Sequence, residues 1–281
     1  MKSCFFYMSI SMLLISACTT EQSSIESNNV KSNLTGKLII TGSSTIAPLV
    51  LELARKFEIK HPESRIDVQT GGSSRGIADV KNKVADIGMV SRELLDKEIK
   101  TFTGHLLARD GISIIVNNTN PTHELENQQI IDIYTGKITN WHSLTGKDAE
   151  ITVIHKAEGR STLDVFLQYF KIKNKQIKPD IIIGDNEQGI KLVAKNPDAI
   201  AYVSIGTAEY DIKQGVTIKT LPLNQIEANT HTLAKGQFPL NRELNFVTLG
   251  PLNQLANHFI QFAVSTEANS TISEFGFVPI N

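Results

Sequence analysis

The sequence predicts an α/β fold with a mostly parallel sheet, divided into two α/β units. Short apolar strands alternate with stretches whose apolar residues recur at helical spacing. Loops rich in Gly, Ser and Thr follow several strands, and the alternation restarts after a polar run at 117–121. A chain of 281 residues with 41% hydrophobic composition is long enough for two domains of modest size.

The first unit repeats the order of a strand, a loop of small residues and a helix. Its expected elements are a strand at 37–41, a loop at 42–45, a helix at 46–57, a strand at 65–69, a loop at 70–76, a helix at 77–84 and a strand at 85–90. An alternation of this kind is built around parallel strands. A further strand at 112–116 is expected to lead into the polar run.

The second unit repeats the same arrangement and then returns to the first. Its expected elements are a helix at 130–134, a strand at 151–154, a loop at 158–162, a helix at 163–170 and a strand at 199–203, followed by strands at 217–221 and 244–248 and a closing helix at 252–264. We therefore expect lobe I to comprise 36–117 plus 215–281 and lobe II to comprise 118–214. Hinge segments are expected near Asn117 and Gln214.

The N-terminus has the pattern of an exported protein. Residues 1–17 combine a basic start, a short apolar run and small residues, as in a secretion signal, and the run is too short to span a bilayer. The segment ISAC ending at Cys18 resembles the lipobox of bacterial lipoproteins, whose cysteine is acylated; the alternative is a plain signal peptide with a chance cysteine. Residues 18–35 are expected to form a flexible tether. With Cys4 in the signal and Cys18 lipidated, the mature domain would contain no thiol.

Charge and histidine content exclude several classes of function. A formal net charge of -1 supplies no long-range field for a polyanion, so nucleic-acid binding is not expected and any anion site must be local. The histidines show neither His-x-x-x-His spacing nor a Glu-paired zinc motif, so we expect no metal site and no cofactor. No nucleotide-binding Gly-x-x-x-x-Gly-Lys-Ser/Thr segment is present in the sequence.

Three loops carry the chemistry expected of an oxyanion site. They lie at 42–45, 71–76 and 160–162, each between an expected strand and an expected helix. Small side chains let the backbone approach an anion, hydroxyls donate, and the helix dipole favours negative charge. Ser and Thr at a helix start also serve as ordinary N-caps, which is the alternative for any single loop. Three such loops converging on one edge favour a ligand site.

Five segments, in order, resemble the periplasmic phosphate-binding proteins of ABC importers. They are 41–46 (TGSSTI), 72–76 (GSSRG), 85–92 (ADIGMVSR), 135–141 (TGKITNW) and 199–203 (AIAYV). The resemblance implies a two-lobed periplasmic-binding-protein (type II) fold, with phosphate held in a cleft between hinged lobes. It also implies delivery to a membrane permease driven by a separate ATPase.

The resemblance assigns ligand contacts to particular positions. In the first loop these are Ser44, Thr45 and Ile46, in the second loop Ser73, and in the third loop Thr162 beside Ser161. Hydroxyls and main-chain N–H groups of these residues would contact the anion, and hinge closure would remove it from water.

Two departures from the family pattern affect positive charge and specificity. Lys156 stands where many members have an arginine, and Arg160 lies in the third loop, where it is expected to bind a pair of phosphate oxygens. The alternative for Arg160 is a surface arginine paired with Glu158 or Asp164.

The second departure is Ser91, which replaces an aspartate that accepts the phosphate proton and repels sulfate. A serine also accepts, so Ser91 is kept in the expected ligand set. Asp86 and Glu158 are alternative acceptors, although Asp86 also fits a structural role at a strand end.

The sequence thus predicts an exported, lipid-anchored, monomeric solute-binding protein that is not an enzyme. The expected ligand is inorganic phosphate, with sulfate or molybdate as the alternative. A hydrolase would need a nucleophile with a base, or carboxylates holding metal ions, near the loops, and the sequence shows neither. A sensory or adhesive surface lipoprotein that keeps this fold is the remaining alternative.

Overall fold

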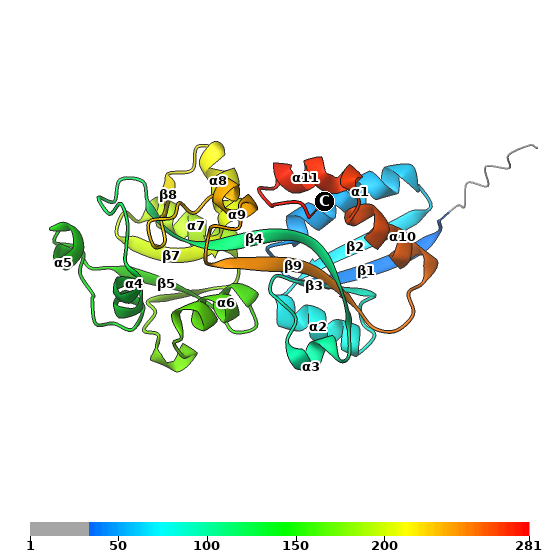
Figure 1. Cartoon of the computed structure of the whole chain (residues 1–281), viewed down its shortest axis with the longest axis horizontal. Helices are drawn as coiled ribbons and strands as arrows, with labels where there is room; N and C mark the ends of the chain where they lie inside the picture. The colour runs from blue at the N-terminus through cyan, green and yellow to red at the C-terminus, as the bar shows by residue number, and fades with distance from the viewer. Residues whose placement is uncertain (1–33, 281) are drawn as a thin grey trace, which may run out of the picture. The chain divides into compact units, whose positions relative to one another are not determined.

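A computed structural model of the chain describes residues 34–280. The secretion signal at 1–17, Cys18 and the tether as far as residue 33 lie outside the described residues. The strands are β1 (Gly36–Gly42), β2 (Ser64–Thr70), β3 (Ile87–Val90), β4 (Thr103–Asn117), β5 (Thr152–Lys156), β6 (Ile181–Ile183), β7 (Ala199–Ser204), β8 (Ile218–Leu221) and β9 (Asn241–Thr248) (Figure 1).

Helices cover the strands on both sides. They are α1 (Ala47–Lys60), α2 (Ser73–Lys81), α3 (Asp96–Ile99), α4 (Asn127–Tyr134), α5 (His142–Thr145), α6 (Ser161–Phe170), α7 (Asn186–Lys195), α8 (Ile205–Lys213), α9 (Thr230–Ala234), α10 (Gln254–Ala263) and α11 (Asn269–Glu274), with short 3-10 turns at Asn174–Gln176 and Thr266–Ala268. Within 34–280, no helix is long and apolar enough to cross a membrane.

The strands follow the order β2-β1-β3-β9-β4-β7-β5-β6, and β8 pairs with β4. β1 is parallel to β2 and β3, and β5 is parallel to β6 and β7, as the strand and helix alternation predicts. β9 and β4 are antiparallel to their neighbours. We refer to β2-β1-β3-β9 as the first half-sheet and to β7-β5-β6 as the second.

The long strand β4 connects the two half-sheets. Its residues 103–111 pair with β9, and its residues 112–116 pair with β7, so one strand belongs to both (Figure 1). Sequence periodicity detects only the second portion, at 112–116. The first portion contains polar residues such as His105 and Arg109 and has no clean apolar alternation.

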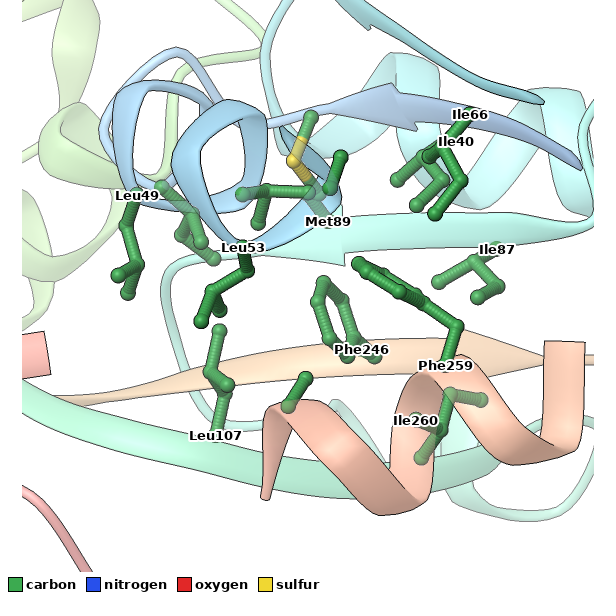
Figure 2. Packing of buried hydrophobic residues seen from close by; sticks show 14 of the residues in the cluster. Ile40, Leu49, Leu53, Ile66, Ile87, Met89, Leu107, Phe246, Phe259 and Ile260 are labelled. Atoms are coloured by element: carbon green, nitrogen blue, oxygen red, sulfur yellow. The ribbon is translucent and has the colours of Figure 1, made fainter. Parts of the chain in front are cut away.

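Each half-sheet has its own hydrophobic core. In the first, α1 and α10 face β1, β3 and β9, and Figure 2 shows Leu49, Leu53, Phe246 and Phe259 meeting there. In the second, the Phe166 ring stacks on Tyr202, with ring centroids 4.0 Å apart. Burying side chains of this size contributes roughly 1.5–3 kcal/mol each, so each core holds the loops of its own half-sheet in place.

The segment after residue 215 packs with the second half-sheet as far as Phe238. β8 pairs with 114–117 of β4, and Leu221, Leu233 and Phe238 pack in the core of the second half-sheet. The polar stretch near 210–215 is the C-terminal end of α8. Ser204 caps the N-terminus of this helix, where its hydroxyl accepts a hydrogen bond from the Thr207 N–H.

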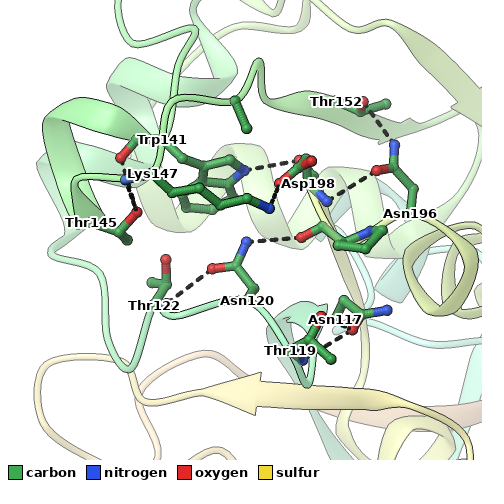
Figure 3. Close-up of polar contacts among 12 residues, drawn as sticks. Asn117, Thr119, Asn120, Thr122, Trp141, Thr145, Lys147, Thr152, Asn196 and Asp198 are labelled. Carbon is green, nitrogen blue, oxygen red and sulfur yellow. Dashed lines mark hydrogen bonds and ion pairs between the residues drawn. The ribbon is translucent and has the colours of Figure 1, made fainter.

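The polar run after β4 is fastened to the segment between α7 and β7. Figure 3 shows this network, in which Asn120 donates to the Pro197 carbonyl at 3.0 Å and the Trp141 indole donates to the Asp198 carbonyl at 3.0 Å. The Asn117 amide donates to the carbonyls of Val193 and Ala194. The asparagines therefore replace backbone pairing where the strand ends.

Candidate functional site

A polar pocket lies where four helices begin. α1, α2, α6 and α7 each follow a parallel strand, so their N-termini meet beyond the carboxyl ends of β1, β2, β5 and β6. The pocket is lined by Ser43, Ser44, Thr45, Gly72, Ser73, Lys156, Arg160, Ser161, Thr162, Gly184, Asp185 and Asn186. Lys156 lies at the end of β5, and the other residues come from the three loops at 42–45, 71–76 and 160–162 and from the start of α7 with the loop before it.

Three of the four helix N-termini at this pocket have no side-chain N-cap. The residues before α1, α2 and α6 are Ile46, Gly72 and Arg160, and none of these side chains caps its helix. α7 differs, because Asp185 accepts from the Gln188 N–H at 2.9 Å. Uncapped first-turn N–H groups and the positive ends of helix dipoles together favour an anion.

The predicted ligand residues divide into two sets. Ser44, Thr45, Ser73, Arg160, Ser161 and Thr162 line the pocket, whereas Ile46 and Ser91 do not. The Ile46 side chain is fully buried in the first core. The Ser91 hydroxyl is hydrogen-bonded to Ser43, and its N–H donates to the Ser73 hydroxyl at 3.1 Å. Ser91 therefore supports the loop residues from behind the pocket.

The second and third loops touch directly. The Ser161 hydroxyl is hydrogen-bonded to the Ser73 hydroxyl, and the Ser74 N–H donates to the Gly159 carbonyl at 3.3 Å. Gly72 has a φ of +95°, and a Cβ at this position would lie 2.6 Å from the Gly159 oxygen. Only glycine permits this approach without displacing backbone.

Lys156 is a buried cation at the base of the pocket. Its side chain extends from the end of β5, and Nζ donates to the Asp185 carbonyl at 2.6 Å and to Asn186 Oδ1 at 3.1 Å. The residue is 2% exposed. Burial lowers the pKa of Lys156 to about 7; Asp185 opposes this shift, and the charges of Arg242 and Arg160 add to it.

Arg160 is half-buried at the pocket rim. The two carboxylates proposed as its surface partners have other contacts. Glu158 accepts from the Asn174 amide at 2.9 Å, and Asp164 lies 3.6 Å from Arg92 Nε. A guanidinium in this position has donors available for a bound oxyanion.

Sequence reasoning missed Asp185, Asn186 and the buried pair Arg242–Asp110. Arg242 Nη1 donates to the Thr162 hydroxyl at 3.0 Å, and Arg242 Nη2 lies 2.7 Å from Asp110 Oδ2. α7 was not predicted from the sequence, so the loop before this helix was not considered as part of the ligand site. A helical spacing at Ile190 and Val193 after Asp185-Asn186 is the signal that would have found it.

Over 34–280, His, Cys, Asp and Glu form no group that could hold a metal ion. The pocket's donors are hydroxyls, backbone N–H groups, the Asn186 amide, one lysine and one arginine, and Asp185 is the carboxylate among its lining residues. This donor set suits a small, fully polar anion.

Known proteins share both the sequence and this fold. A sequence model of the PBP superfamily domain matches residues 23–267. The phosphate-binding protein PstS of Bacillus subtilis (strain 168) is 26% identical over 281 residues, covering 97% of this chain and 92% of that protein.

Two crystal structures extend the similarity. One, from Clostridium perfringens and described as a phosphate ABC transporter substrate-binding protein with bound phosphate, has a TM-score of 0.81 and 28% identity, covering 88% of this chain and 100% of its own. An ABC-type phosphate transport receptor from Vibrio cholerae has a TM-score of 0.72 and 30% identity, covering 86% and 99%. The expected α/β periplasmic-binding fold is thus confirmed. The chain belongs to the PBP superfamily, and within it resembles the PstS group of phosphate-binding proteins.

Proposed function

We propose that the protein is the solute-binding component of an ABC importer, which captures inorganic phosphate and delivers it to a membrane permease. The observation that carries this proposal is the polar pocket at four converging helix N-termini, three of them without a side-chain cap. Relatives over nearly the whole chain are named phosphate-binding proteins, which supports phosphate as the ligand.

The pocket residues have distinct proposed roles. Ser44, Thr45, Ser73, Ser161 and Thr162 supply hydroxyl and backbone donors, while Lys156 and Arg160 supply charge-assisted donors. Ile46 is proposed to act only through its backbone, since its side chain lies in the core.

Discrimination against sulfate requires an acceptor for the phosphate proton. We assign this role to Asp185, because it lines the pocket and Ser91 does not. Asp86 accepts from the Ile39 N–H at 2.8 Å, in keeping with a structural role at a strand end. Glu158 does not line the pocket, and its carboxylate accepts from the Asn174 amide.

The lobe division is also a proposal. Separate cores in the two half-sheets support a hinge where β4 passes from its pairing with β9 to its pairing with β7, near residues 111 and 112 rather than at Asn117. The packing of Leu221, Leu233 and Phe238 supports a second crossing at β9 rather than at Gln214. Opening about these segments would admit the ligand, and closing would remove it from water.

We also propose secretion by residues 1–17, acylation of Cys18 as the sole attachment to the membrane, and action as a monomer with permease subunits and a separate ATPase. Mass spectrometry of the membrane-bound protein tests the acylation. We expect an N-terminal peptide that begins at acylated Cys18, and an unmodified N-terminal peptide that begins after position 18 would contradict the proposal.

Isothermal calorimetry of the purified protein with phosphate, sulfate, molybdate and a phosphate ester tests the function. We expect one phosphate per chain and weaker binding of sulfate. Absence of binding to every oxyanion would refute transport and leave a sensory or adhesive role, and turnover of the ester would favour a hydrolase.

A further inference from the structure

Arg242 lies at the start of β9, directly across the β4–β9 pairing from Asp110. Its Nε and Nη2 donate to Asp110 Oδ2 at 3.0 and 2.7 Å, and the two side chains are only 1% and 0% exposed. A buried ion pair of this kind recovers little net stability after desolvation. Stability alone therefore does not explain this buried arginine, and its remaining hydrogen bonds indicate its role.

The remaining edge of Arg242 faces the two threonines of the pocket. Nη1 donates to the Thr162 hydroxyl at 3.0 Å, and Nη2 lies 3.5 Å from the Thr45 hydroxyl. Thr45 belongs to the loop before α1, and Thr162 belongs to the first turn of α6. A single guanidinium thus contacts pocket hydroxyls from both half-sheets.

Hydrogen-bond chemistry then fixes what these hydroxyls do. A guanidinium only donates, whereas a hydroxyl has one proton and two acceptor sites. Thr45 also accepts from the Asn186 amide at 3.3 Å, so both of its acceptor sites are occupied. Each threonine oxygen accepts from Arg242, so each O–H remains available as a donor, and both residues line the pocket.

We propose that Arg242 is a positioning residue for oxyanion binding, which holds the hydroxyls of Thr45 and Thr162 in the donor orientation before the anion arrives. The inference rests on the proposed function and deepens it. Asp110 holds the guanidinium from the other side, and its Oδ1 accepts from the Gly206 N–H at 3.3 Å. Because Asp110 balances its charge, Arg242 acts by orientation, for which the planar fork is needed.

A double-mutant cycle tests this role. Arg242→Lys keeps a cation opposite Asp110 but lacks the fork, and Thr162→Val removes one hydroxyl with little change in shape. We expect Thr162→Val to bind phosphate about tenfold more weakly, and Arg242→Lys at least tenfold more weakly because it also releases Thr45. The double variant should bind about as weakly as Arg242→Lys alone, because that variant has already lost the oriented Thr162 donor. Arg109→Lys, at an exposed arginine beside Asp110, is the matched control and should bind like wild type.

Additive losses in the cycle would overturn the inference, as would unchanged affinity in Arg242→Lys. Thermal unfolding and circular dichroism establish that each variant is folded. If Arg242→Lys does not fold, the neutral pair Asp110→Asn with Arg242→Gln replaces it in the same cycle. If the wild-type protein binds sulfate or molybdate but not phosphate, only the proposed ligand is refuted. The double-mutant cycle is then measured with the anion that binds. A wild type that binds no oxyanion refutes both proposals.

Discussion

Lys156 should make the stability of the ligand-free protein depend on pH in a way that one substitution removes. Burial lowers its pKa to about 7, whereas the unfolded chain keeps a value near 10.5. Between these values the unfolded state binds more protons than the folded state, so the free energy of unfolding rises with pH. Below pH 7 both states are protonated and the slope from this group disappears.

The magnitude follows from the two pKa values. Integrating proton binding from pH 7 to pH 9 gives a gain of about 2 kcal/mol for Lys156 alone. The charged groups that face this ammonium are Asp185 before α7, Arg160 before α6 and Arg242 on β9, and the Tyr202 hydroxyl on β7 accepts from the Lys156 N–H at 3.2 Å. Comparing wild type with a variant that lacks the Lys156 ammonium therefore isolates its contribution.

Urea unfolding of the ligand-free protein at pH 7, 8 and 9 measures this gain. Wild type should gain about 2 kcal/mol more than Lys156→Met over the range. Equal slopes for the two proteins would refute a depressed pKa. Bound anion should raise the pKa of Lys156 again. Sulfate, which does not titrate here, should therefore bind at least tenfold more tightly at pH 7 than at pH 9, and Lys156→Arg should lose that dependence.

Three further predictions concern the loops and their supports. Asp185→Asn should lower the ratio of phosphate affinity to sulfate affinity by about tenfold or more, as measured by calorimetry. An unchanged ratio would refute the proposal that Asp185 accepts the phosphate proton. Gly72→Ala should destabilise the fold by about 1–3 kcal/mol in urea unfolding, because the added Cβ meets the Gly159 oxygen at a positive φ; Gly215→Ala, where φ is also positive but no atom lies within 4 Å, is the control and should cost less. Trp141→Phe should cost about 1–2 kcal/mol, since the Asp198 carbonyl loses its indole donor, and phosphate affinity should stay unchanged.

Local sequence patterns were sufficient to predict the parts of the fold built from neighbouring residues. The strand, loop and helix at 36–60 need only apolar periodicity and small loop residues, and the structure has them as β1, the pocket loop and α1. The same holds for β5 and α6. The pocket loops follow from this arrangement, because parallel strands bring their carboxyl ends to one edge.

Contacts that depend on pairing across the chain were not predictable in this way. Arg242 reaches the pocket only because β9 is antiparallel to β4, which sets it opposite Asp110. No local pattern around Arg242 marks it as different from a surface arginine on an edge strand. The sequence also did not show that Ser91 lies outside the pocket. Its place after β3 follows from the pattern, but the direction of its side chain towards Ser43 does not.

The arrangement of cations is consistent with oxyanion binding by a chain whose formal net charge is -1. Each positive group near the pocket is balanced locally: Arg242 by Asp110, Lys156 by ready loss of its proton, and Arg160 by partial exposure to water. A dry pocket with three uncompensated cations would strongly oppose folding. We expect an entering anion to raise the pKa of Lys156, so that its positive charge is present when the anion is bound. Neutral hydroxyls and helix N-termini supply the remaining contacts without adding charge, so the ion pairs that release must break are limited to those with Lys156 and Arg160.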